Sequence, residues 1–313
     1  MTDGLEASSD GGMTRAGFVA LIGEPNAGKS TLLNRMVGAK VSIVTHKVQT
    51  TRARLRGVAM HDQTQIIFVD TPGLFRPRRT LDRAMVAAAW SGAADADLIV
   101  VMAEAHRGLT EGLERILSDL PERAAGRPVA LAVNKIDKVR RKDLLALVAE
   151  LSAKMAFEQV FLISAEKGDG VSDLKSWLAQ QMPEGPWLYP EDDISDLPLR
   201  MIAAEITREK LTLRLHQELP YQLTVETETW DDRKDGSTKI EQVIYVARDG
   251  HKGIVLGKKG ETIREIGKLA RADIAELIER PVHLFTRIVV RPEWLTEAER
   301  FEQIGLDIKD ANE

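Results

Sequence analysis

Eight residues near the start of the chain constrain its fold more than any other stretch. They read Gly23-Glu24-Pro25-Asn26-Ala27-Gly28-Lys29-Ser30, which has the glycine, lysine and serine spacing of a phosphate-binding loop. An apolar, strand-like run at 18–22 precedes them, and a helix-like run that starts with Thr31 follows. Strand, glycine-rich turn and helix in this order predict an α/β fold, and a chance glycine turn is a poor alternative.

The residue types of this loop predict its chemistry. Its glycines let successive backbone N–H groups turn toward a phosphate chain, in front of a helix N-terminus. Lys29 can reach the β- and γ-phosphates, and the Ser30 hydroxyl can ligate Mg²⁺. We therefore predict that residues 23–31 bind the phosphates of a nucleoside triphosphate.

Three later segments indicate which base is bound. Asp70-Thr71-Pro72-Gly73 follows an apolar run, and a carboxylate there can hold a water of the Mg²⁺ shell while the Gly73 N–H senses the γ-phosphate. Asn134-Lys135-Ile136-Asp137 follows a second run; Asp137 can accept both N–H groups on the guanine edge, a donor pair that adenine lacks. Ser164-Ala165-Glu166 follows a third run, where the Ala165 N–H can bond guanine O6.

Each segment alone has an ordinary alternative as a capping aspartate or a turn at a strand end. Four of them in this order, each at the carboxyl end of a strand, do not, because open parallel sheets bind ligands at that edge. The set resembles the GTPase signature. The resemblance implies a P-loop GTPase domain over residues 15–181, with a mostly parallel sheet and helices on both faces.

Between the phosphate loop and Asp70, the segment at 47–52 contains two adjacent threonines. A GTPase needs a hydroxyl here that meets Mg²⁺ only while the γ-phosphate is present. By resemblance to the T-T-R segment of translation-associated GTPases, Thr51 is the predicted residue and Thr50 the alternative; a polar turn fits the residues alone equally well. The predicted metal contacts are Ser30, Thr51 and, through water, Asp70.

The residue after Gly73 is Leu74, where Ras-like enzymes place a glutamine that orients the attacking water. Leucine cannot do this, so we expect slow intrinsic hydrolysis, on the order of 10⁻³ per second or below. Related GTPases carry asparagine at the position of Asn26, and by that resemblance we hypothesise that Asn26 helps a K⁺ ion supply the missing positive charge. The predicted catalytic residues are Lys29, Asn26, Thr51 and Gly73.

Composition limits the remaining possibilities. The chain has 313 residues, enough for two domains with separate cores, and its 43% apolar and 29% charged residues are typical of soluble globular proteins. No apolar run approaches the roughly 20 residues that span a bilayer. Residues 1–14 are polar, lack the features of a secretory signal and are predicted to be a disordered tail. The absence of cysteine excludes disulfides, and we expect a cytoplasmic protein.

The second half of the chain differs from the first in composition and in its predicted order of helices and strands. Residues 182–198 are rich in proline and acidic residues and are predicted to be a linker. A helix from 199, strands near 221–229 and 240–248, a loop run at 250–260, a helix and a strand at 282–290 are expected to follow. The second helix has a predicted apolar face made of Ile263, Ile266, Leu269, Ala270, Ile274 and Leu277.

A cationic glycine loop lies in this half. Residues 248–271 hold seven Lys and Arg against three acidic residues, whereas the whole chain has a net charge of −5. The helix–strand–strand–helix–strand order with Gly257-Lys258-Lys259-Gly260 resembles an α+β type II KH domain, whose G-x-x-G loop binds single-stranded RNA. The predicted RNA contacts are Lys252, Gly257, Lys258, Lys259, Gly260, Arg264, Lys268 and Arg271.

One GTPase domain followed by this KH unit resembles the Era family of bacterial ribosome-assembly GTPases, over roughly residues 15–305. The resemblance extends to 48–52, 218–221 and 254–271. It implies a GTP/GDP switch with Mg²⁺ that binds the 3′ end region of 16S rRNA during maturation of the 30S subunit. It also implies peripheral association with the inner membrane, for which the sequence shows no lipid anchor. We expect a monomer, a KH domain at 199–305 and a C-terminal tail at 306–313.

Two other functions and one departure stay open. Leu74 favours an RNA-binding assembly factor in which GTP turnover is incidental. A KH-like unit that docks protein is a third possibility, against which the lysines of the loop at 257–260 argue. Glu24 stands where the family resemblance leads us to expect arginine: pointed inward its carboxylate would repel the phosphates, whereas pointed outward it would be harmless.

Overall fold

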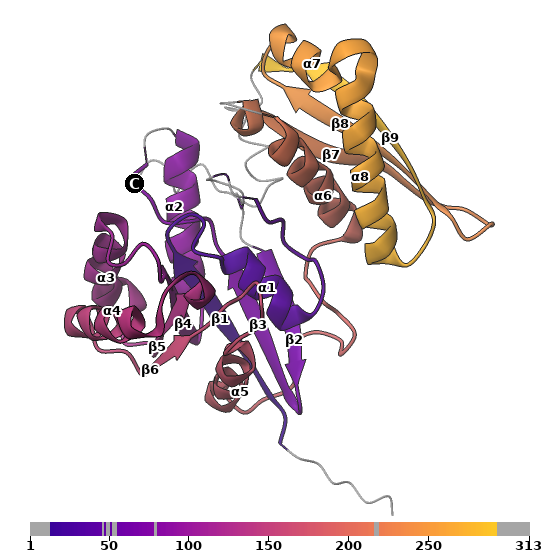
Figure 1. Ribbon diagram of the computed structural model, residues 1–313. Helices are drawn as coiled ribbons and strands as arrows, with labels where there is room; N and C mark the ends of the chain where they lie inside the picture. The colour runs from indigo at the N-terminus through magenta and orange to yellow at the C-terminus, as the bar shows by residue number, and fades with distance from the viewer. Residues whose placement is uncertain are drawn as a thin grey trace, which may run out of the picture.

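The computed structural model describes residues 13–45, 47, 51, 55–77, 80–215 and 219–292 (Figure 1). The predicted tail at 1–14 therefore lies outside the described residues except for Met13 and Thr14. The predicted C-terminal tail at 306–313, and the part of the predicted KH domain from 293 onward, also lie outside them. Thr14 is ordered against the later chain, because its hydroxyl donates to the carbonyl oxygen of Gly185 at 2.9 Å.

The first half of the chain forms a six-stranded sheet in the order β2-β3-β1-β4-β5-β6. All neighbouring strands are parallel except β2, which pairs antiparallel with β3. The strands are β1 (Arg15–Gly23), β2 (Leu55–His61), β3 (Thr64–Asp70), β4 (Leu98–Glu104), β5 (Val129–Asn134) and β6 (Gln159–Leu162).

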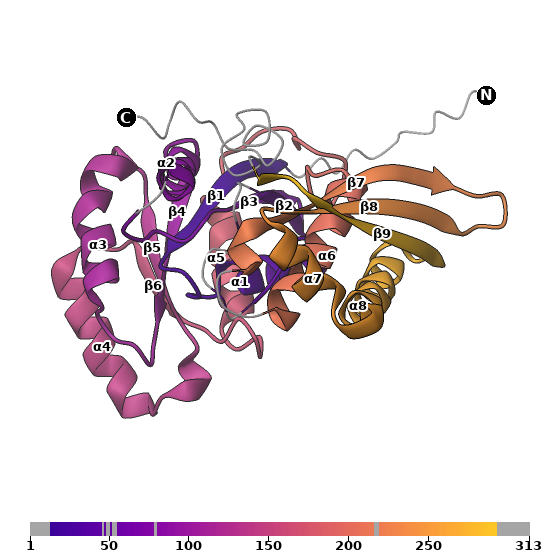
Figure 2. The ribbon, with the colours of Figure 1, turned by 90° about the horizontal axis from the view of Figure 1, so that it is seen from above.

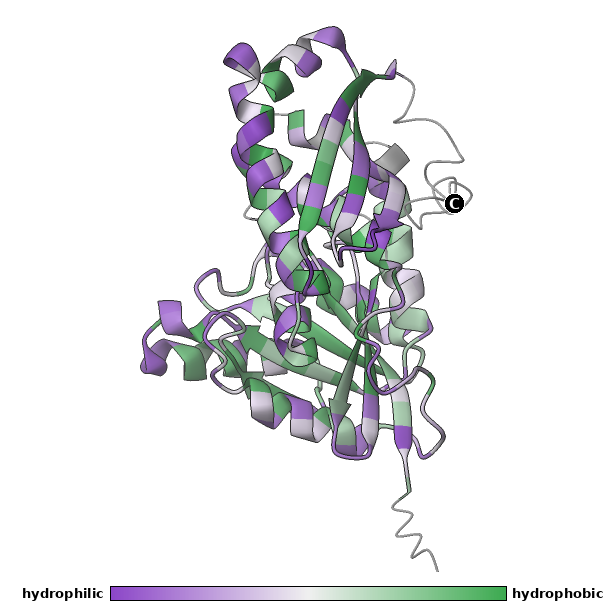
Figure 3. Cartoon of the chain, turned by 90° about the vertical axis from the view of Figure 1, so that its right-hand side faces the viewer, coloured by the Kyte–Doolittle hydropathy of each residue, from purple (hydrophilic) through white to green (hydrophobic). Residues whose placement is uncertain are grey.

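Helices cover both faces of this sheet (Figure 1). Helices α1 (Lys29–Val37) and α5 (Val171–Gln181) pack on one face, and α2 (Thr80–Ala94), α3 (Glu111–Ala124) and α4 (Arg141–Lys154) pack on the other. Side chains alternate between faces along a strand, so Val19 and Leu21 of β1 join the first core while Ala20 and Ile22 join the second. Burial on both faces explains why the strands are continuous apolar runs (Figure 3).

The topology brings the predicted motifs to one edge of the sheet. The phosphate loop follows β1, Asp70 ends β3, Asn134 ends β5, and Ser164 lies just beyond β6. The apolar runs that the sequence indicated are these strands. Strand β2 was not anticipated; its residues, LRGVAMH, alternate poorly, and it forms at the edge of the sheet by pairing with β3.

The segment at 182–198 lies along the first domain rather than standing free of it. The side-chain amide of Gln65, a fully buried residue of β3, accepts from the backbone N–H groups of Leu188 and Tyr189 and donates to the Tyr189 carbonyl, at 2.8–2.9 Å. Ser195 then pairs antiparallel with Gly57 on the outer side of β2. We call residues 182–198 the strap; it covers part of the open edge that β2 would otherwise present.

The second half of the chain forms a three-stranded sheet in the order β7-β8-β9, with β7 and β8 antiparallel and β8 and β9 parallel. Its long β7–β8 hairpin projects away from the first domain (Figure 2). Helices α6 and α8 bury apolar stripes against this sheet, among them Ile202, Leu211, Ile266 and Ile274. The elements are α6 (Leu199–Arg214), β7 (Leu223–Asp232), β8 (Thr238–Val246), α7 (Asp249–Leu256), α8 (Glu261–Ile278) and β9 (Val282–Val290).

Two expectations for this half were wrong. Residues 249–256 form helix α7 instead of a loop, although Gly250 and Gly253 are poor helix formers, because Val255 is fully buried in the core and tertiary packing overrides propensity. Leu269 does not share the buried face of α8, since 48% of it is exposed. Ile254 and Leu256 of α7 are exposed as well.

Candidate nucleotide and RNA sites

The phosphate loop is shaped by what lies behind it. Gly28 has φ +99°, and a Cβ there would lie 2.2 Å from the side-chain nitrogen of Asn134. Only glycine therefore lets the loop pack against the end of β5. The loop forms one wall of a pocket of about 510 Å³, whose other walls include residues 43–45, 47 and 51, Gly73, Lys135 and Glu166.

Lys29 lies inside this loop with 6% of its surface exposed. Its Nζ donates to the carbonyl oxygens of Gly23 and Glu24, both at 3.1 Å, which holds the ammonium where a phosphate chain would pass. Burial lowers the pKa of Lys29 to about 8, although Asp70 and Glu104 attract the charge. A bound phosphate would restore the usual preference for the charged form.

The hydroxyl groups of two predicted metal contacts, Ser30 and Thr51, converge on a carboxylate oxygen of the third, Asp70. Oδ2 of Asp70 accepts from Ser30 Oγ at 2.7 Å and from Thr51 Oγ1 at 3.3 Å, and the two hydroxyl oxygens are 3.0 Å apart. Ser42, which sequence reasoning missed, also donates to Oδ2 at 2.9 Å. Thr50, the alternative to Thr51, lies outside the described residues.

This oxygen cluster fits a small divalent cation. Asp70 is fully buried, burial raises the pKa of its carboxyl group, and its Oδ1 has no hydrogen-bond partner among the residues that the structure describes. A buried carboxylate with an unpaired oxygen is costly on its own, and a nearby cation offsets that cost. Mg²⁺ prefers oxygen ligands and keeps several waters, so Ser30 and Thr51 can bind it directly while Asp70 holds one of its waters.

Leu74 faces away from the nucleotide pocket. Its N–H donates to the Gly23 carbonyl at 3.0 Å, while its side chain is buried in the core under α2. Gly73, the preceding residue, stays on the pocket wall. The geometry therefore leaves Gly73 where a γ-phosphate sensor is predicted and provides no side chain from position 74 that could orient a water.

Asn134 connects the phosphate loop to the segment that follows β6. Its amide nitrogen donates to the Ala27 carbonyl at 2.8 Å, and its Oδ1 accepts from the Ala165 N–H at 2.9 Å. The predicted contact between Ala165 and guanine O6 thus involves an N–H that already has a partner here. Because Asn134 is only 2% exposed, its side chain holds these two segments together instead of contacting the base.

Asp137 is held in position by its neighbours. Ser164, fully buried, donates to Asp137 Oδ1 at 2.8 Å, and the Lys167 ammonium lies 3.7 Å from Oδ2. The Ser164 hydrogen bond holds the pKa of Asp137 below its ordinary value. An ionised, oriented carboxylate is the acceptor that two guanine N–H donors require.

Lys135 and Glu104 close one side of the pocket. Lys135 Nζ donates to the Asn26 carbonyl at 2.7 Å and to Oε2 of Glu104 at 2.5 Å. Glu104, with 8% exposed surface, ends β4 at the same sheet edge as the other motifs, a position that could have signalled it from the sequence. Glu166 also lines the pocket.

Glu24 points outward, which makes it the harmless case. Its Oε2 accepts from the Thr110 hydroxyl at 2.5 Å and lies 3.8 Å from the Arg107 guanidinium. Thr110 is the N-cap of α3, so the acid interacts with the start of this helix instead of with phosphates.

The G-x-x-G loop joins α7 to α8. Gly257 has φ +69°, and a Cβ there would lie 2.1 Å from the Thr262 hydroxyl. Lys252, Lys258, Lys259, Lys268 and Arg271 are all exposed.

Arg264 behaves differently from those five residues. Its guanidinium donates to the carbonyl oxygens of Lys259 and Gly260, at 2.6 and 3.1 Å, and so stiffens the loop from within. A role in positioning the two lysines fits this geometry better than a phosphate contact.

The two domains meet at a cluster of four charges, which we call the interdomain cluster. Lys40, just after α1, lies 2.6 Å from Glu209 of α6 and 2.7 Å from Asp273 of α8. Lys210 lies 3.3 and 2.5 Å from the same two acids. Burial alone would lower the pKa of Lys40, but hydrogen bonds to Asp273 and Glu209 more than offset this and raise it.

The loop that leads to Thr51 also contacts α6. Glu209 Oε1 accepts from the Val44 N–H at 2.8 Å. Lys47 Nζ donates to the Thr212 carbonyl at 2.5 Å and to that of Leu215, at the carboxyl end of the helix where cations are favoured. Both domains therefore bind the same loop.

Comparisons with known proteins agree with this architecture. A family model described as "50S ribosome-binding GTPase" matches residues 18–135, and one described as "KH domain" matches residues 218–295. GTPase Era of Dinoroseobacter shibae is 68% identical over 96% of this chain and 97% of its own length. GTPase Era of Rhizobium meliloti is 58% identical over 98% of each chain.

The chain belongs to the GTPase Era family. It is a GTPase with a P-loop domain followed by a KH domain, as the motifs indicated. Two solved Era structures each match it with a TM-score of 0.88 and 37% identity, covering 93% of this chain and 99% of the other. One is a tyrosine-to-alanine variant from Aquifex aeolicus bound to GDP·AlF₄⁻, and the other is a complex with MgGDPNP and nucleotides 1506–1542 of 16S ribosomal RNA.

Replacing the buried carboxylate of this Era-family chain separates stability from metal binding. Because burial raises the pKa of Asp70, the ionised form opposes folding once the pH exceeds the ordinary carboxyl value. We expect Asp70→Asn to leave the melting temperature of the nucleotide-free protein unchanged or higher, and to weaken Mg²⁺-dependent GTP affinity by about 10–100-fold. Asp143→Asn, on the exposed surface of α4, should change neither; a large fall in melting temperature for Asp70→Asn would contradict this account.

Proton uptake reports on Lys29. At pH 9 the free protein holds this amine mostly neutral, because its pKa is about 8, so GTP binding should take up close to one proton, whereas at pH 7 Lys29 should take up little. Calorimetry in two buffers of different ionisation enthalpy measures this number. Lys29→Arg keeps its charge at both pH values and should abolish the uptake at pH 9; equal uptake in both proteins would show that another group titrates.

Proposed function

We propose that this GTPase is a Mg²⁺-dependent switch that binds the 3′ end region of 16S rRNA through its KH domain and acts in maturation of the 30S subunit. The observation that carries the proposal is the combination, in one chain, of an oriented guanine-nucleotide pocket and a stiffened cationic G-x-x-G loop. The Era structure in complex with MgGDPNP and nucleotides 1506–1542 of 16S rRNA supports the choice of RNA and metal.

The geometry of the KH loop supports single-stranded RNA as its ligand. Lys258 and Lys259 are exposed at the N-terminal end of α8, where the helix dipole adds to their attraction for phosphates. The exposed apolar side chains Ile254, Leu256 and Leu269 on α7 and α8 offer surface on which unstacked bases can lie. Both features favour RNA over the protein-docking alternative.

We infer that the loop at 40–51 transmits the nucleotide state to the KH domain. Thr51 is at the metal site, whereas Lys40, Val44 and Lys47 contact α6 or α8. A change in the position of Thr51 on binding or losing the γ-phosphate therefore pulls on contacts with the second domain. This coupling favours a switch over an assembly factor with incidental turnover.

The protein is proposed to act in the cytoplasm as a monomer, with the inner membrane as a peripheral location. Within the part of the chain that the structure describes, no helix is long and apolar enough to cross a membrane. K⁺ is proposed as an activator beside Asn26, a residue on the wall of the nucleotide pocket.

Loss of the two loop lysines should weaken RNA binding. We expect Lys258→Ala/Lys259→Ala to reduce affinity for an oligonucleotide of the 16S 3′ end by on the order of tenfold or more, with a shallower salt dependence, because two phosphate contacts are lost. Fluorescence anisotropy with a GTP analogue measures both. The matched pair Lys142→Ala/Lys154→Ala on α4 should bind normally; unchanged affinity in the loop variant would instead favour a protein ligand for the KH unit.

Loss of Lys40 should uncouple the domains. We expect Lys40→Ala to bring RNA affinities in GDP and in a GTP analogue to within about twofold of each other, since Glu209 of α6 and Asp273 of α8 both lose their cationic partner in the loop. GTP affinity should not change. Lys154→Ala, which removes an exposed ion pair with Glu114, serves as the control, and a preserved nucleotide effect in Lys40→Ala would refute the coupling role.

The cation hypothesis predicts faster GTP hydrolysis in K⁺ than in Na⁺. We expect roughly tenfold or greater stimulation, because a positive charge beside the phosphates stabilises the transition state, and its loss in Asn26→Ala. Single-turnover rates at equal ionic strength provide the measurement. Equal rates in the two salts would dispose of the hypothesis.

A further inference from the structure

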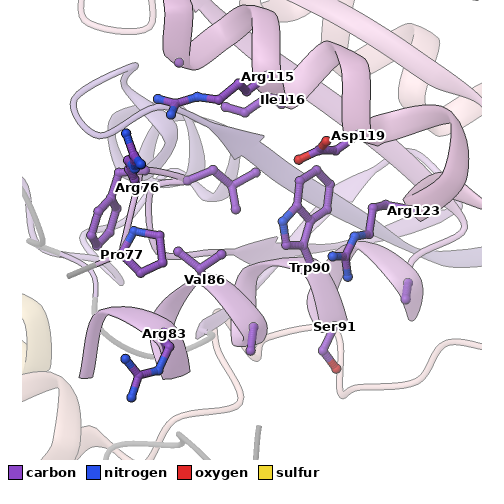
Figure 4. Close-up of a pocket in the computed structure, with 15 residues that line it drawn as sticks. Arg76, Pro77, Arg83, Val86, Trp90, Ser91, Arg115, Ile116, Asp119 and Arg123 are labelled. Carbon is purple, nitrogen blue, oxygen red and sulfur yellow. The ribbon is translucent and has the colours of Figure 1, made fainter. Parts of the chain in front are cut away.

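A second cleft, of about 710 Å³, lies between α2 and α3 beside the segment that follows Gly73 (Figure 4). Its floor is apolar and includes Leu74, Val86, Trp90 and Ile116. None of the residues that line it lines the nucleotide pocket. The cleft is therefore separate from the site at which GTP is hydrolysed.

Arginine dominates the rim of this cleft. The four exposed residues Arg76, Arg83, Arg115 and Arg123 surround the floor, and Asp119 is the acidic residue among the described lining residues (Figure 4). Like charges gathered around one opening repel each other, so this arrangement is stabilised by an anionic occupant. Guanidinium groups are also suited to bidentate hydrogen bonds with carboxylates.

Existing contacts of Arg115 and Arg123 leave that capacity largely intact. Arg115 lies 3.7 Å from Glu111, an ion pair between two exposed side chains that is worth little. Arg123 stacks over the ring of Trp90 at 5.5 Å, which fixes its guanidinium at the edge of the floor. An arginine rim around an apolar centre is the usual anatomy of a protein-binding hot spot.

The floor favours protein over RNA as the occupant. Trp90 is 8% exposed and Arg123 lies over its ring, so the aromatic surface is not open for stacking with a base, which is how single strands are bound without sequence preference. The arginines encircle a depression rather than following a line, as a phosphate backbone would require. A bulky apolar side chain flanked by carboxylates fits the half-buried lining residues Phe75, Val86 and Ala87 together with the rim.

Both walls of the cleft are attached to loops that line the nucleotide pocket. On one side, Leu74 to Pro77 directly follow the γ-phosphate sensor Gly73. On the other, Thr110 caps α3 by accepting from the Leu113 N–H at 3.0 Å and donates to Glu24 of the phosphate loop. A change at the phosphates therefore reaches α2 and α3 together.

We propose that this cleft docks an acidic segment of a partner protein, anchored by one bulky apolar side chain, and that its affinity depends on the bound nucleotide. The glutamate at position 24 gives the chain a direct connection between its phosphate loop and this docking surface.

A synthetic peptide with a central Leu-Trp pair between runs of Glu and Asp is the probe. Fluorescence anisotropy of the labelled peptide with the full chain, in GDP and in a GTP analogue, should give affinities that differ by at least threefold. Arg83→Glu/Arg115→Glu should weaken binding at least tenfold, and so should replacing Leu-Trp by Ser-Ser in the peptide. The matched charge reversal Arg140→Glu/Arg141→Glu, at the start of α4, should stay within twofold of the unchanged protein.

Each contrary result overturns a definite part of the proposal. Equal weakening of peptide binding in both charge-reversal variants would show that the arginines of the cleft act only through long-range electrostatic attraction. Tighter, Arg83- and Arg115-dependent binding of an oligouridylate of equal charge would make the cleft an RNA site, and no binding of the peptide would remove the site altogether. Ala87→Leu, which narrows the floor without altering charge, should also weaken the peptide, and normal GTP affinity in every variant shows that the domain is folded.

Discussion

One buried carboxylate connects three segments of the GTPase domain. Asp70 ends β3, and its Oδ2 accepts from Ser30 at the start of α1, from Ser42 in the loop after α1, and from Thr51. Its other oxygen has no hydrogen-bond partner within the described part of the chain. Because the group is fully buried, these hydroxyls and the metal that it is built to face set the cost of keeping its charge. Two residues of the loop at 40–51, Ser42 and Thr51, therefore donate hydrogen bonds to that carboxylate.

The same loop also contacts the KH domain through its charged side chains. Lys40 and Lys47 contact α6 and α8, and Glu209 accepts from both Lys40 and the Val44 backbone. Polar contacts of this kind are typical of surfaces that separate and re-form, whereas a large apolar interface would hold the domains permanently. Glu209 is nevertheless nearly buried, so it is costly to leave without a cation.

The nucleotide site was largely predictable from the sequence because its residues sit in short motifs at strand ends, and the topology of a parallel sheet gathers those ends. Features that depend on distant pairing were not. Lys40 contacts residues 169 and 233 positions away, with no local signal in the sequence. Helix α7 contains two glycines and forms because Val255 is buried, and the engagement of the Ala165 N–H by Asn134 follows from packing alone.

The strap affects where the chain can be cut to produce a fragment that contains only the GTPase domain. A GTPase fragment that stopped at the end of α5 would lose the backbone that pairs with β2, leave the amide of Gln65 buried without partners, and present an unprotected strand edge. Such edges recruit other copies. Residues 182–198 thus contact the domain that precedes them along β2 and β3.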